Sequence, residues 1–570
     1  MTTYEKDTTT PVPPWPFTAR EDELDLVRRS LTGDRRGIVV TGPAGCGKTR
    51  LLAEAVRGGG CVRAAGTPES RAMPFAAFAH VLPEAVTLPR AVHLLSGAGT
   101  VVVDDAHLLD DASAALVHQL AVHGRARLLV AAPDGSATPG AITRLWTGEL
   151  LPRLALEPLP DEETARLLTA GAGPLDPLTA GRLLRLGRGD LRLLRELLHA
   201  VGPLLAAGPD SGERGWRGPV PLTAAVRAYA APVLGHDCPR ERETLDRLAF
   251  GEPLEPTVDG LDLAALEALE SDGVIEVGPR GGVRFTHPLH GPVLRAAAGR
   301  LRARRLSPGP EAYAAALDAE ASALARRIDG DDVTAMPTPV GDFLVTEGGP
   351  VPGAYAAVRA RFARLRGEPR TAAAWAGEGL RADPGDVTCR DELDRATGLG
   401  SPRPTLREPY DAVRLGTPGE AAGRRLRGVF ARHADALARA DGPALDAAAE
   451  ELAERGFILF AAEAYAQAVA VHRDPRAARH ARTRAVALAR RCQDARTPAL
   501  SGLALGELTA RQRQIVTLAA AGLSNRQIAE RLTLSIRTVG NHLYGAYTRL
   551  GAVDRTALPR LAEPLEAQPA

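Results

Sequence analysis

The spacing of hydrophobic and polar residues changes along this chain. Between residues 19 and 200, short β-branched runs alternate with stretches of helical periodicity, which predicts a parallel sheet with crossover helices. Residues 222–305 show helical periodicity and then two strand-like runs around a turn at 279–281, which predicts helices followed by a β-hairpin. Farther along, Ala- and Arg-rich blocks at 354–383 and 420–493 predict helices.

Pro- and Gly-rich segments mark where these regions are expected to separate. The segments 202–221, 330–353 and 398–419 have the composition of linkers or long loops. Residues 354–383 have the small and aromatic spacing of one tetratricopeptide-like helix pair. The sequence predicts five parts, namely a flexible tail at 1–18, an α/β domain with a helical lid at 19–205, a winged-helix-like domain at 206–305, a helical region at 306–500 and a separate helical unit at 501–570.

Composition and charge narrow the class of protein further. The 70 basic and 69 acidic residues nearly cancel, so only a local charge excess could indicate a nucleic-acid partner. The five cysteines lie far apart without a CxxC pair, which favours a reducing compartment over a disulfide framework. The N-terminal segment lacks the apolar core of a signal peptide, and no apolar run approaches the ~20 residues that cross a bilayer. We therefore expect a cytoplasmic protein with no membrane partner.

A phosphate-binding loop stands out near the N-terminus. Residues 42–49, with the sequence GPAGCGKT, match the pattern GxxxxGK[ST] in full, between an expected strand at 37–40 and an expected helix at 50–57. Small residues let backbone N–H groups surround a phosphate, Lys48 is expected to reach the β- and γ-phosphates, and Thr49 to bind Mg²⁺. The expected nucleotide-binding residues are Gly42, Pro43, Ala44, Gly45, Cys46, Gly47, Lys48 and Thr49.

A second acidic motif completes the expected ATP and Mg²⁺ site. Residues 100–103 form a predicted buried strand that ends in Asp104 and Asp105, as in a Walker B motif, although an ordinary strand and turn would look similar. Asp104 is expected to hold Mg²⁺ directly or through water, and Asp105 is the candidate catalytic residue that orients a water molecule. A third expected strand at 127–131 ends in apolar residues, without the polar sensor of the γ-phosphate found in many ATPases. Slow hydrolysis at most is therefore expected.

A helix-turn-helix pattern lies near the C-terminus. Ser524 is placed to cap a helix at 525–532, a turn follows at 533–534, and Ser535 is placed to cap a helix that runs to about residue 550. At ~100° per residue, one face of the second helix carries an apolar stripe, made of Val539, Leu543, Ala546 and Leu550. The opposite face carries a polar stripe, made of Arg537, Asn541, Tyr544 and Thr548.

These two faces suit a helix that reads double-stranded DNA. The apolar stripe can pack on the domain while the polar stripe enters the major groove, where Asn541 could read an adenine and Arg537 a guanine or a phosphate. Residues 508–560 carry eight arginines against two acids, a surplus of six charges that favours DNA over the alternative of an ordinary amphipathic bundle. The residues expected to contact DNA are Ser524, Asn525, Arg526, Arg537, Thr538, Asn541, Tyr544 and Thr548.

At these residues the chain resembles a known family. Residues 508–551 resemble the LuxR-type helix-turn-helix, with matches that include Gly522-Leu523-Ser524-Asn525, Ile528-Ala529, Thr538-Val539 and His542-Leu543. Together with the phosphate-binding loop, most of the chain resembles the large ATP-binding LuxR-family regulators, which belong to the signal-transducing (STAND) ATPases. Further matching stretches are residues 19–24, 103–107, 285–289 and 492–498.

The resemblance implies a nucleotide switch. ADP would hold a closed monomer, whereas ATP and an inducer of unknown identity would favour an open, self-associating form that activates transcription by RNA polymerase at a promoter. It also implies that His287 corresponds to a winged-helix histidine that contacts nucleotide phosphate in some relatives, although a capping or core-edge histidine fits equally well. The chain departs from the family at Gly189-Asp190-Leu191, where Gly-Asn-Pro is usual.

The function expected from the sequence is therefore an ATP/ADP-switched, DNA-binding transcriptional regulator, most simply an activator and not an enzyme in the ordinary sense. Two alternatives stay open at this point. One is a DNA-binding protein whose nucleotide site is purely structural, and the other is a motor ATPase that remodels DNA or protein.

Overall fold

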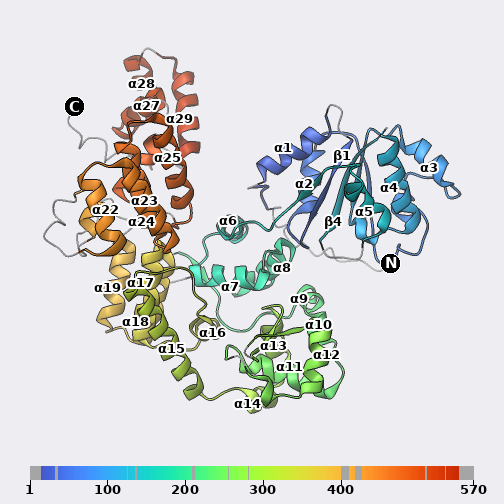
Figure 1. Cartoon of the computed structure of the whole chain (residues 1–570), viewed down its shortest axis with the longest axis horizontal. Coiled ribbons are helices and arrows are strands. Elements are labelled where there is room, and N and C mark those ends of the chain that lie inside the picture. The colour runs from blue at the N-terminus through green and yellow to red at the C-terminus, as the bar shows by residue number, and fades with distance from the viewer. Residues whose placement is uncertain are drawn as a thin grey trace, which may run out of the picture. The chain divides into compact units, whose positions relative to one another are not determined.

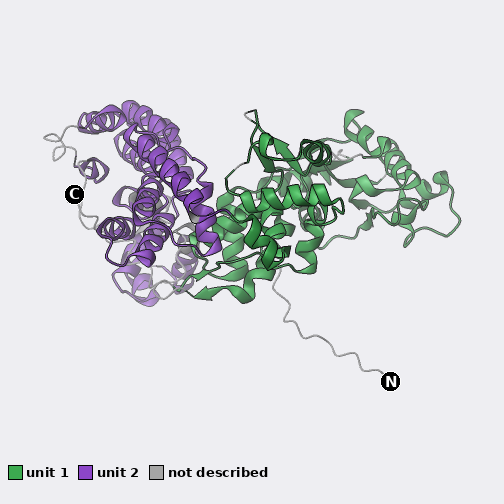
Figure 2. Cartoon of the chain, turned by 90° about the horizontal axis from the view of Figure 1, so that it is seen from below, with its two compact units in different colours: residues 1–307 green, residues 308–570 purple. Residues whose placement is uncertain are grey.

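A computed structural model of the chain contains many helices and one five-stranded parallel sheet (Figure 1). The residues that the structure describes are 15–18, 20–32, 36–124, 126–134, 138–207, 212–254, 256–279, 281–398, 410–417, 426–493, 495–506, 510–532 and 534–550. The predicted tail up to residue 14, the turn residue Thr533, the side chain of Thr548 and everything beyond residue 550 lie outside this description. The chain divides into two compact units, residues 1–307 and 308–570 (Figure 2).

The centre of the first unit is a five-stranded sheet with the order β2-β3-β4-β1-β5, in which all paired strands are parallel. The strands are β1 (Gly37–Gly42), β2 (Val62–Ala65), β3 (Thr100–Asp104), β4 (Arg127–Pro133) and β5 (Arg153–Ala155). This topology confirms the predicted P-loop type of α/β sheet. Strand β4 lies between the strand that leads into the phosphate-binding loop and the strand that ends in Asp104.

Side chains alternate between the two faces of this sheet. On β3, Val101 and Val103 belong to one core cluster and Val102 belongs to the other. The first face is covered by α3 (Leu88–Leu95), α4 (Asp111–His123) and α5 (Gly140–Thr147), and the second by α1 (Glu21–Ser30) and α2 (Lys48–Ala55) (Figure 1). Because both faces are buried there, the inner strands β1, β3 and β4 are almost continuously apolar, as is usual for parallel sheets.

The rest of the first unit is helical with two small hairpins. The lid helices are α6 (Asp161–Ala172), α7 (Pro177–Gly187) and α8 (Leu191–Val201). The following elements are β6 (Ala206–Ala207), β7 (Arg214–Gly215), α9 (Ala224–Tyr229), α10 (Ala231–Leu234), α11 (Pro239–Gly251), α12 (Leu263–Ser271), β8 (Ile275–Val277), β9 (Val283–Phe285), α13 (His290–Ala297) and α14 (Arg300–Leu306). The predicted hairpin is confirmed, since β8 and β9 pair antiparallel with Ile275 opposite Phe285.

Of the two forms predicted for residues 202–221, a linker or a long loop, the described residues fit a packed loop. They do not form an open linker, because β6 pairs with β7 and Trp216 is fully buried beneath the Arg182 guanidinium, 3.5 Å from its ring centre. Trp216 belongs to a core cluster that runs from Leu168 of the lid to Leu294 of α13. The lid and the winged-helix-like part therefore share a single hydrophobic core.

The second unit consists of helices. Its elements are α15 (Pro310–Asp329), α16 (Pro339–Glu347), α17 (Gly353–Arg366), α18 (Pro369–Ala382), α19 (Val387–Gly398), α20 (Asp411–Arg414), α22 (Gly428–Ala438), α23 (Gly442–Glu454), α24 (Ile458–Val471), α25 (Pro475–Ala489), α26 (Pro498–Gly506), α27 (Ala510–Ala520), α28 (Asn525–Leu532) and α29 (Ile536–Leu550). The predicted helix pair at 354–383 corresponds to α17 and α18, which pack on each other. In the described part of the chain, no helix is both long and apolar enough to traverse a bilayer.

Two other predicted loops contain helices. Residues 330–353 include α16, whose Val340 and Val345 are buried. Residues 398–419 include the short helix α20, whose Val413 lies inside the core of the helical unit. Proline and glycine, which predict a loop, also occur at the ends of helices, because proline is tolerated in the first turn and glycine follows the last one. Helix α16 has proline and glycine at these places.

Candidate functional site

The phosphate-binding loop joins β1 to α2 in the conformation that a phosphate site requires. Gly45 and Gly47 have φ values of 69° and 101°, a left-handed backbone that favours glycine. Among the described residues, the N–H groups of Gly45, Gly47 and Thr49 have no hydrogen-bond acceptor. Unpaired donors that converge at a helix N-terminus fit the oxygen atoms of a phosphate. The loop residues predicted from the sequence therefore suit a nucleoside di- or triphosphate.

Lys48 lies folded back onto this loop. Its Nζ atom donates to the main-chain oxygen atoms of Gly42, at 2.8 Å, and of Pro43, at 2.7 Å. The neighbouring Cys46 thiol is buried, and this burial raises its pKa in spite of the lysine charge nearby. The ammonium group is thus hydrogen-bonded to the loop itself, and it would have to turn outward to reach a β- or γ-phosphate.

The acidic pair sits where the sequence places it, at the carboxyl end of β3. The Asp105 N–H donates to the Asp104 carboxylate at 3.0 Å, and Asp105 has a left-handed φ of 45°. Partial desolvation, and then the charge of Asp104, raise the pKa of Asp105, while Lys48 and Arg192 oppose this rise. A carboxylate pair beside Lys48 fits the Mg²⁺ of a bound nucleotide, for which Thr49 and Asp104 are the predicted ligands.

Strand β4, the strand expected at residues 127–131, ends without a polar side chain that could sense the γ-phosphate. At the end of β4, Ala131 and Ala132 are buried, and Pro133 follows. The next residue, Asp134, donates its N–H to the Gly42 carbonyl, and its carboxylate forms an ion pair with Arg153 at 2.9 Å. Asp134 is the first polar residue after β4, and its carboxylate is already paired with Arg153.

The lid contacts the phosphate-binding loop directly. The Leu191 N–H donates to the Gly45 carbonyl at 3.0 Å. The Asp190 carboxylate lies so close to Gly45 that a Cβ atom there would stand 1.9 Å from its Oδ1 atom. The same carboxylate accepts the N–H groups of Arg192 and Leu193 and so caps α8. The two residues that depart from the family pattern, Asp190 and Leu191, are therefore the lid residues that contact the loop.

His287 lies next to this contact, after β9. Its Nδ1 atom accepts the Leu289 N–H at 3.1 Å, so this nitrogen carries no proton, and in the neutral ring Nε2 carries it. Burial lowers the pKa of His287, with Arg188 adding to the effect and Asp190 opposing it. The capping role and the predicted role in phosphate binding are compatible, because Nε2 has no hydrogen-bond partner in the part of the chain that is described.

Two lid side chains that lie at this site, Arg188 and Arg192, belong to no motif in the sequence. Arg188 donates to the main-chain oxygen of Thr286 and so ties the lid to the segment that carries His287. Arg192, in the first turn of α8, is close enough to Asp105 to lower its pKa. Their signal in the sequence is only two arginines on either side of Gly189-Asp190, in a chain that is rich in arginine.

The second candidate site is the helix-turn-helix formed by α28 and α29. Ser524 and Gln527 cap α28 reciprocally, since each accepts the other's backbone N–H. Ser535 accepts the Thr538 N–H at 3.0 Å and caps α29. Arg511 of α27 donates to the Leu532 carbonyl at 2.6 Å, which fixes the end of α28. Both caps agree with the prediction.

The two faces of α29 are also as predicted up to Ala546, whereas the side chain of Leu550, predicted on the apolar face, lies outside the described residues. Val539, Leu543 and Ala546 are buried in a small core with Ile528 and other residues of α27 and α28. Arg537 and Asn541 are exposed, and Tyr544 is 76% exposed. Of the other residues expected to contact DNA, Ser524 and Arg526 are exposed, while Asn525 and Thr538 are partly exposed at the helix starts. The arrangement leaves one polar face of α29 open to a DNA groove.

Comparison with known proteins supports the helix-turn-helix prediction for this part of the chain. Residues 506–562, about a tenth of the chain, match the family of bacterial regulatory proteins described as the luxR family. Over 53 residues the chain is 47% identical to an HTH-type transcriptional regulator named in Mycobacterium bovis and to one in Mycobacterium tuberculosis, and over 52 residues it is 48% identical to one in Escherichia coli. These matches cover 9% of this chain, but only 6% of the mycobacterial relatives and 26% of the Escherichia coli relative.

Two solved structures resemble the chain weakly. One is a signal transduction ATPase with numerous domains and a tetratricopeptide repeat sensor from Pyrococcus horikoshii, at 14% identity and a TM-score of 0.24, over 96% of this chain and 78% of that protein. The other is the RuvB Holliday junction branch migration motor of Thermotoga maritima, at 16% identity and a TM-score of 0.26, over 46% of this chain and 90% of that protein. Since both TM-scores are below 0.5, the P-loop fold rests on the strand order described above. Residues 506–562 thus match the helix-turn-helix domain of the luxR family, and their combination with a P-loop sheet fits the large ATP-binding type that the sequence resembles.

Proposed function

We propose that this chain is a transcriptional regulator in which ADP or ATP at residues 42–49, together with Mg²⁺, controls how the helix-turn-helix engages promoter DNA. The observation that carries the proposal is the contact between the lid and the loop. Leu191 bonds to Gly45, and the Asp190 carboxylate lies against the same residue. A phosphate bound to the N–H groups of the loop would lie beside this contact, so nucleotide occupancy would change the stability of the closed lid.

The energetic requirement for such a switch is differential affinity. A nucleotide shifts the balance between closed and open forms only as far as it binds one of them better. The carboxylate of Asp190 and the ring of His287 reach the site from the lid and from the winged-helix-like part, so both lie where an opening motion would remove them. Slow hydrolysis would follow from the apolar end of β4. Self-association of the ATP form, an inducer and contact with RNA polymerase belong to the same proposal.

Substitution of Lys48 tests the proposal. Because hydrogen bonds to charged groups contribute about 1.5–3 kcal/mol, we expect Lys48→Ala to weaken binding of fluorescent ADP and ATP about 10- to 150-fold. Arg50→Ala, which removes an exposed positive charge two residues farther along α2, is the matched control and should bind both nucleotides normally. Promoter activation in a reporter strain should fall for Lys48→Ala alone. Full activation by a Lys48→Ala chain that binds no nucleotide would refute the switch and favour a purely structural site.

A further inference from the structure

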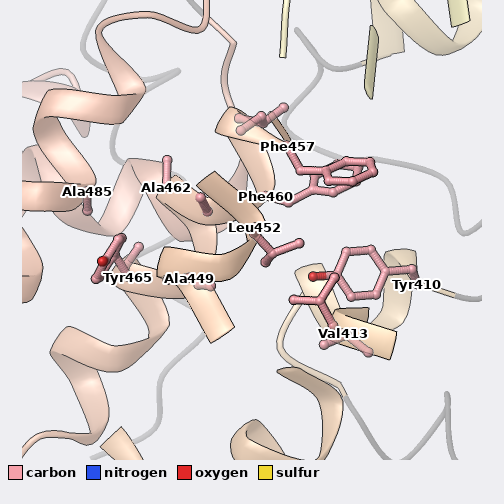
Figure 3. Close-up of a cluster of buried hydrophobic side chains, with 14 of the residues drawn as sticks. Tyr410, Val413, Ala449, Leu452, Phe457, Phe460, Ala462, Tyr465 and Ala485 are labelled. Carbon is pink, nitrogen blue, oxygen red and sulfur yellow. The ribbon is translucent and has the colours of Figure 1, made fainter. Parts of the chain in front are cut away.

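The helical unit holds a short piece of chain by side chains that come from distant helices. This piece, residues 410–417, contains α20 and is called the inserted turn below. Tyr410 and Val413 project into the core formed by α23 and α24, beside Leu452 and Phe460 (Figure 3). Tyr410 is 7% exposed and Val413 is fully buried. One side chain of the four-residue helix α20 and the tyrosine just before it are thus packed into a much larger helical scaffold, and the space that they occupy there is called the hollow below.

A chain of directed hydrogen bonds lines this hollow. The Tyr410 hydroxyl lies 2.5 Å from His433 Nδ1, and His433 Nε2 lies 2.7 Å from Gln467 Oε1. Burial lowers the pKa of His433 to about 4, so the ring is neutral, and it accepts from Tyr410 and donates to Gln467. The Gln467 amide nitrogen then donates to the main-chain oxygens of Val413, at 2.9 Å, and Arg414, at 3.1 Å. These carbonyls are at the end of α20, where that of Val413 also accepts the Gly416 N–H at 3.1 Å.

A buried ion pair closes the other end of the hollow. Arg414 forms a two-pronged pair with Glu463, at 2.7 and 2.9 Å, and its guanidinium lies 4.4 Å from the centre of the Phe460 ring. The side chain of Glu463 is only 1% exposed. Removing one member of such a pair leaves an uncompensated buried charge, which is strongly unfavourable. Whatever occupies the hollow must therefore bring a guanidinium to Glu463.

The inserted turn contributes little structure of its own. Its backbone N–H groups donate within the turn, for example from Leu415 to Asp411 and from Thr417 to Ala412. The polar contacts that anchor it to other elements come from side chains of α22 and α24, at His433, Glu463 and Gln467. Recognition of a tyrosine hydroxyl, two carbonyls and a guanidinium by buried side chains has the chemistry of a protein that binds a short helical peptide.

We propose that the hollow between α22 and α24 is a peptide-binding site, filled in this structure by the inserted turn, and that a partner segment with the same chemistry displaces the turn. The segment would carry a tyrosine, an aliphatic residue three positions later and then an arginine, to match Tyr410, Val413 and Arg414. Because of the internal occupant, the apparent affinity for the partner is the intrinsic affinity multiplied by the fraction of molecules in which the site is open. The proposal concerns the helical unit alone and does not depend on the nucleotide switch.

Competition with a synthetic peptide tests the proposal in the full-length chain. The probe is a fluorescent peptide with the sequence of residues 407–418, and the control probe has alanine at the position of Arg414. We expect the Arg414→Ala chain to bind the probe at least tenfold more tightly than the wild-type chain does, because its own turn no longer satisfies Glu463. We expect Glu463→Gln to abolish binding. Arg432→Ala, which removes an exposed guanidinium from α22, should bind the probe as the wild-type chain does.

A second measurement covers the possibility that Arg414→Ala fails to fold. In the wild-type chain, excess probe should speed hydrogen exchange at the backbone N–H groups of residues 411–417, whereas the control probe should not. Binding to a folded Arg414→Ala chain supports the site, and if that variant does not fold, faster exchange in the wild type supports it. If a folded Arg414→Ala chain ignores the probe, or if that variant does not fold and the wild-type exchange is unchanged, residues 410–417 are simply part of the core and the proposal is overturned.

Discussion

Replacing Asp190 by asparagine isolates the charge of one lid residue. Asparagine caps a helix about as well as aspartate does, so the two hydrogen bonds that hold the start of α8 should survive the substitution. The change removes only the negative charge that lies against Gly45 of the phosphate-binding loop. We expect Asp190→Asn to bind ADP and ATP more tightly than the wild-type chain, because a like charge beside the phosphates is lost.

The size of the effect follows from the geometry. Asp190 Oδ1 is 1.9 Å from the ideal Cβ position on Gly45, so the carboxylate is in contact with the loop that would hold the β-phosphate. For two like charges at about 7 Å, the repulsion is ~0.6 kcal/mol at a dielectric constant of about 80 and ~2.4 kcal/mol at about 20. The expected gain in affinity is therefore about threefold to fiftyfold, and it should shrink as salt is added.

Titration with a fluorescent ADP analogue measures this gain. Asp190→Ala is the control, because it loses the same charge together with the helix cap, which costs about 1 kcal/mol of stability. If repulsion operates, Asp190→Asn should bind at least as tightly as Asp190→Ala and should melt at a higher temperature. An Asp190→Asn chain that keeps α8 folded but binds ADP no better than the wild type would show that the carboxylate does not face the phosphates.

Three other predictions concern the second unit. Arg537→Ala should weaken promoter binding and lower the slope of log affinity against log salt by about 1 if this residue contacts a phosphate, whereas Arg479→Ala, an exposed arginine of α25, should change neither. Ile528→Ala should cost the DNA-binding domain about 2–5 kcal/mol in denaturant unfolding, whereas Ile536→Ala, at a side chain that is 54% exposed, should cost far less. The pKa of His433 is about 4 in the folded chain against 6.5 when exposed, so below pH 6.5 the unfolded state binds the proton first. Up to about 3 kcal/mol of stability should be lost as the pH falls from 6.5 to 4, and His433→Gln should flatten that part of the profile.

Features that depend on neighbours in sequence could be predicted. The loop at 42–49 carries its glycines and its lysine within eight residues, and the caps Ser524 and Ser535 act on N–H groups three residues away. The opposite faces of α29 follow from helical periodicity alone. For the same reason, β1, β3 and the hairpin of β8 and β9 lie where the apolar runs predict them.

Features that depend on packing between distant segments could not be predicted. The contact of Asp190 with Gly45 joins residues that are 145 positions apart, and no local pattern encodes it. Residues 202–221 have the composition of a linker, yet Trp216 becomes part of a core because the lid supplies a hollow for it. The inserted turn was missed in the same way, since its burial is decided by Glu463 and Gln467 on another helix.

The shared core of the lid and the winged-helix-like part has a mechanical consequence. Because Leu168 and Leu294 belong to one hydrophobic cluster, we expect any opening motion to carry α8 and His287 together. The Leu156 N–H is bonded to Thr41 of the sheet, and Arg20 donates to the Glu157 carbonyl, so we expect such a motion to bend the chain at residues 158–160. Two of those three residues are prolines, which narrows the directions in which the chain can bend there.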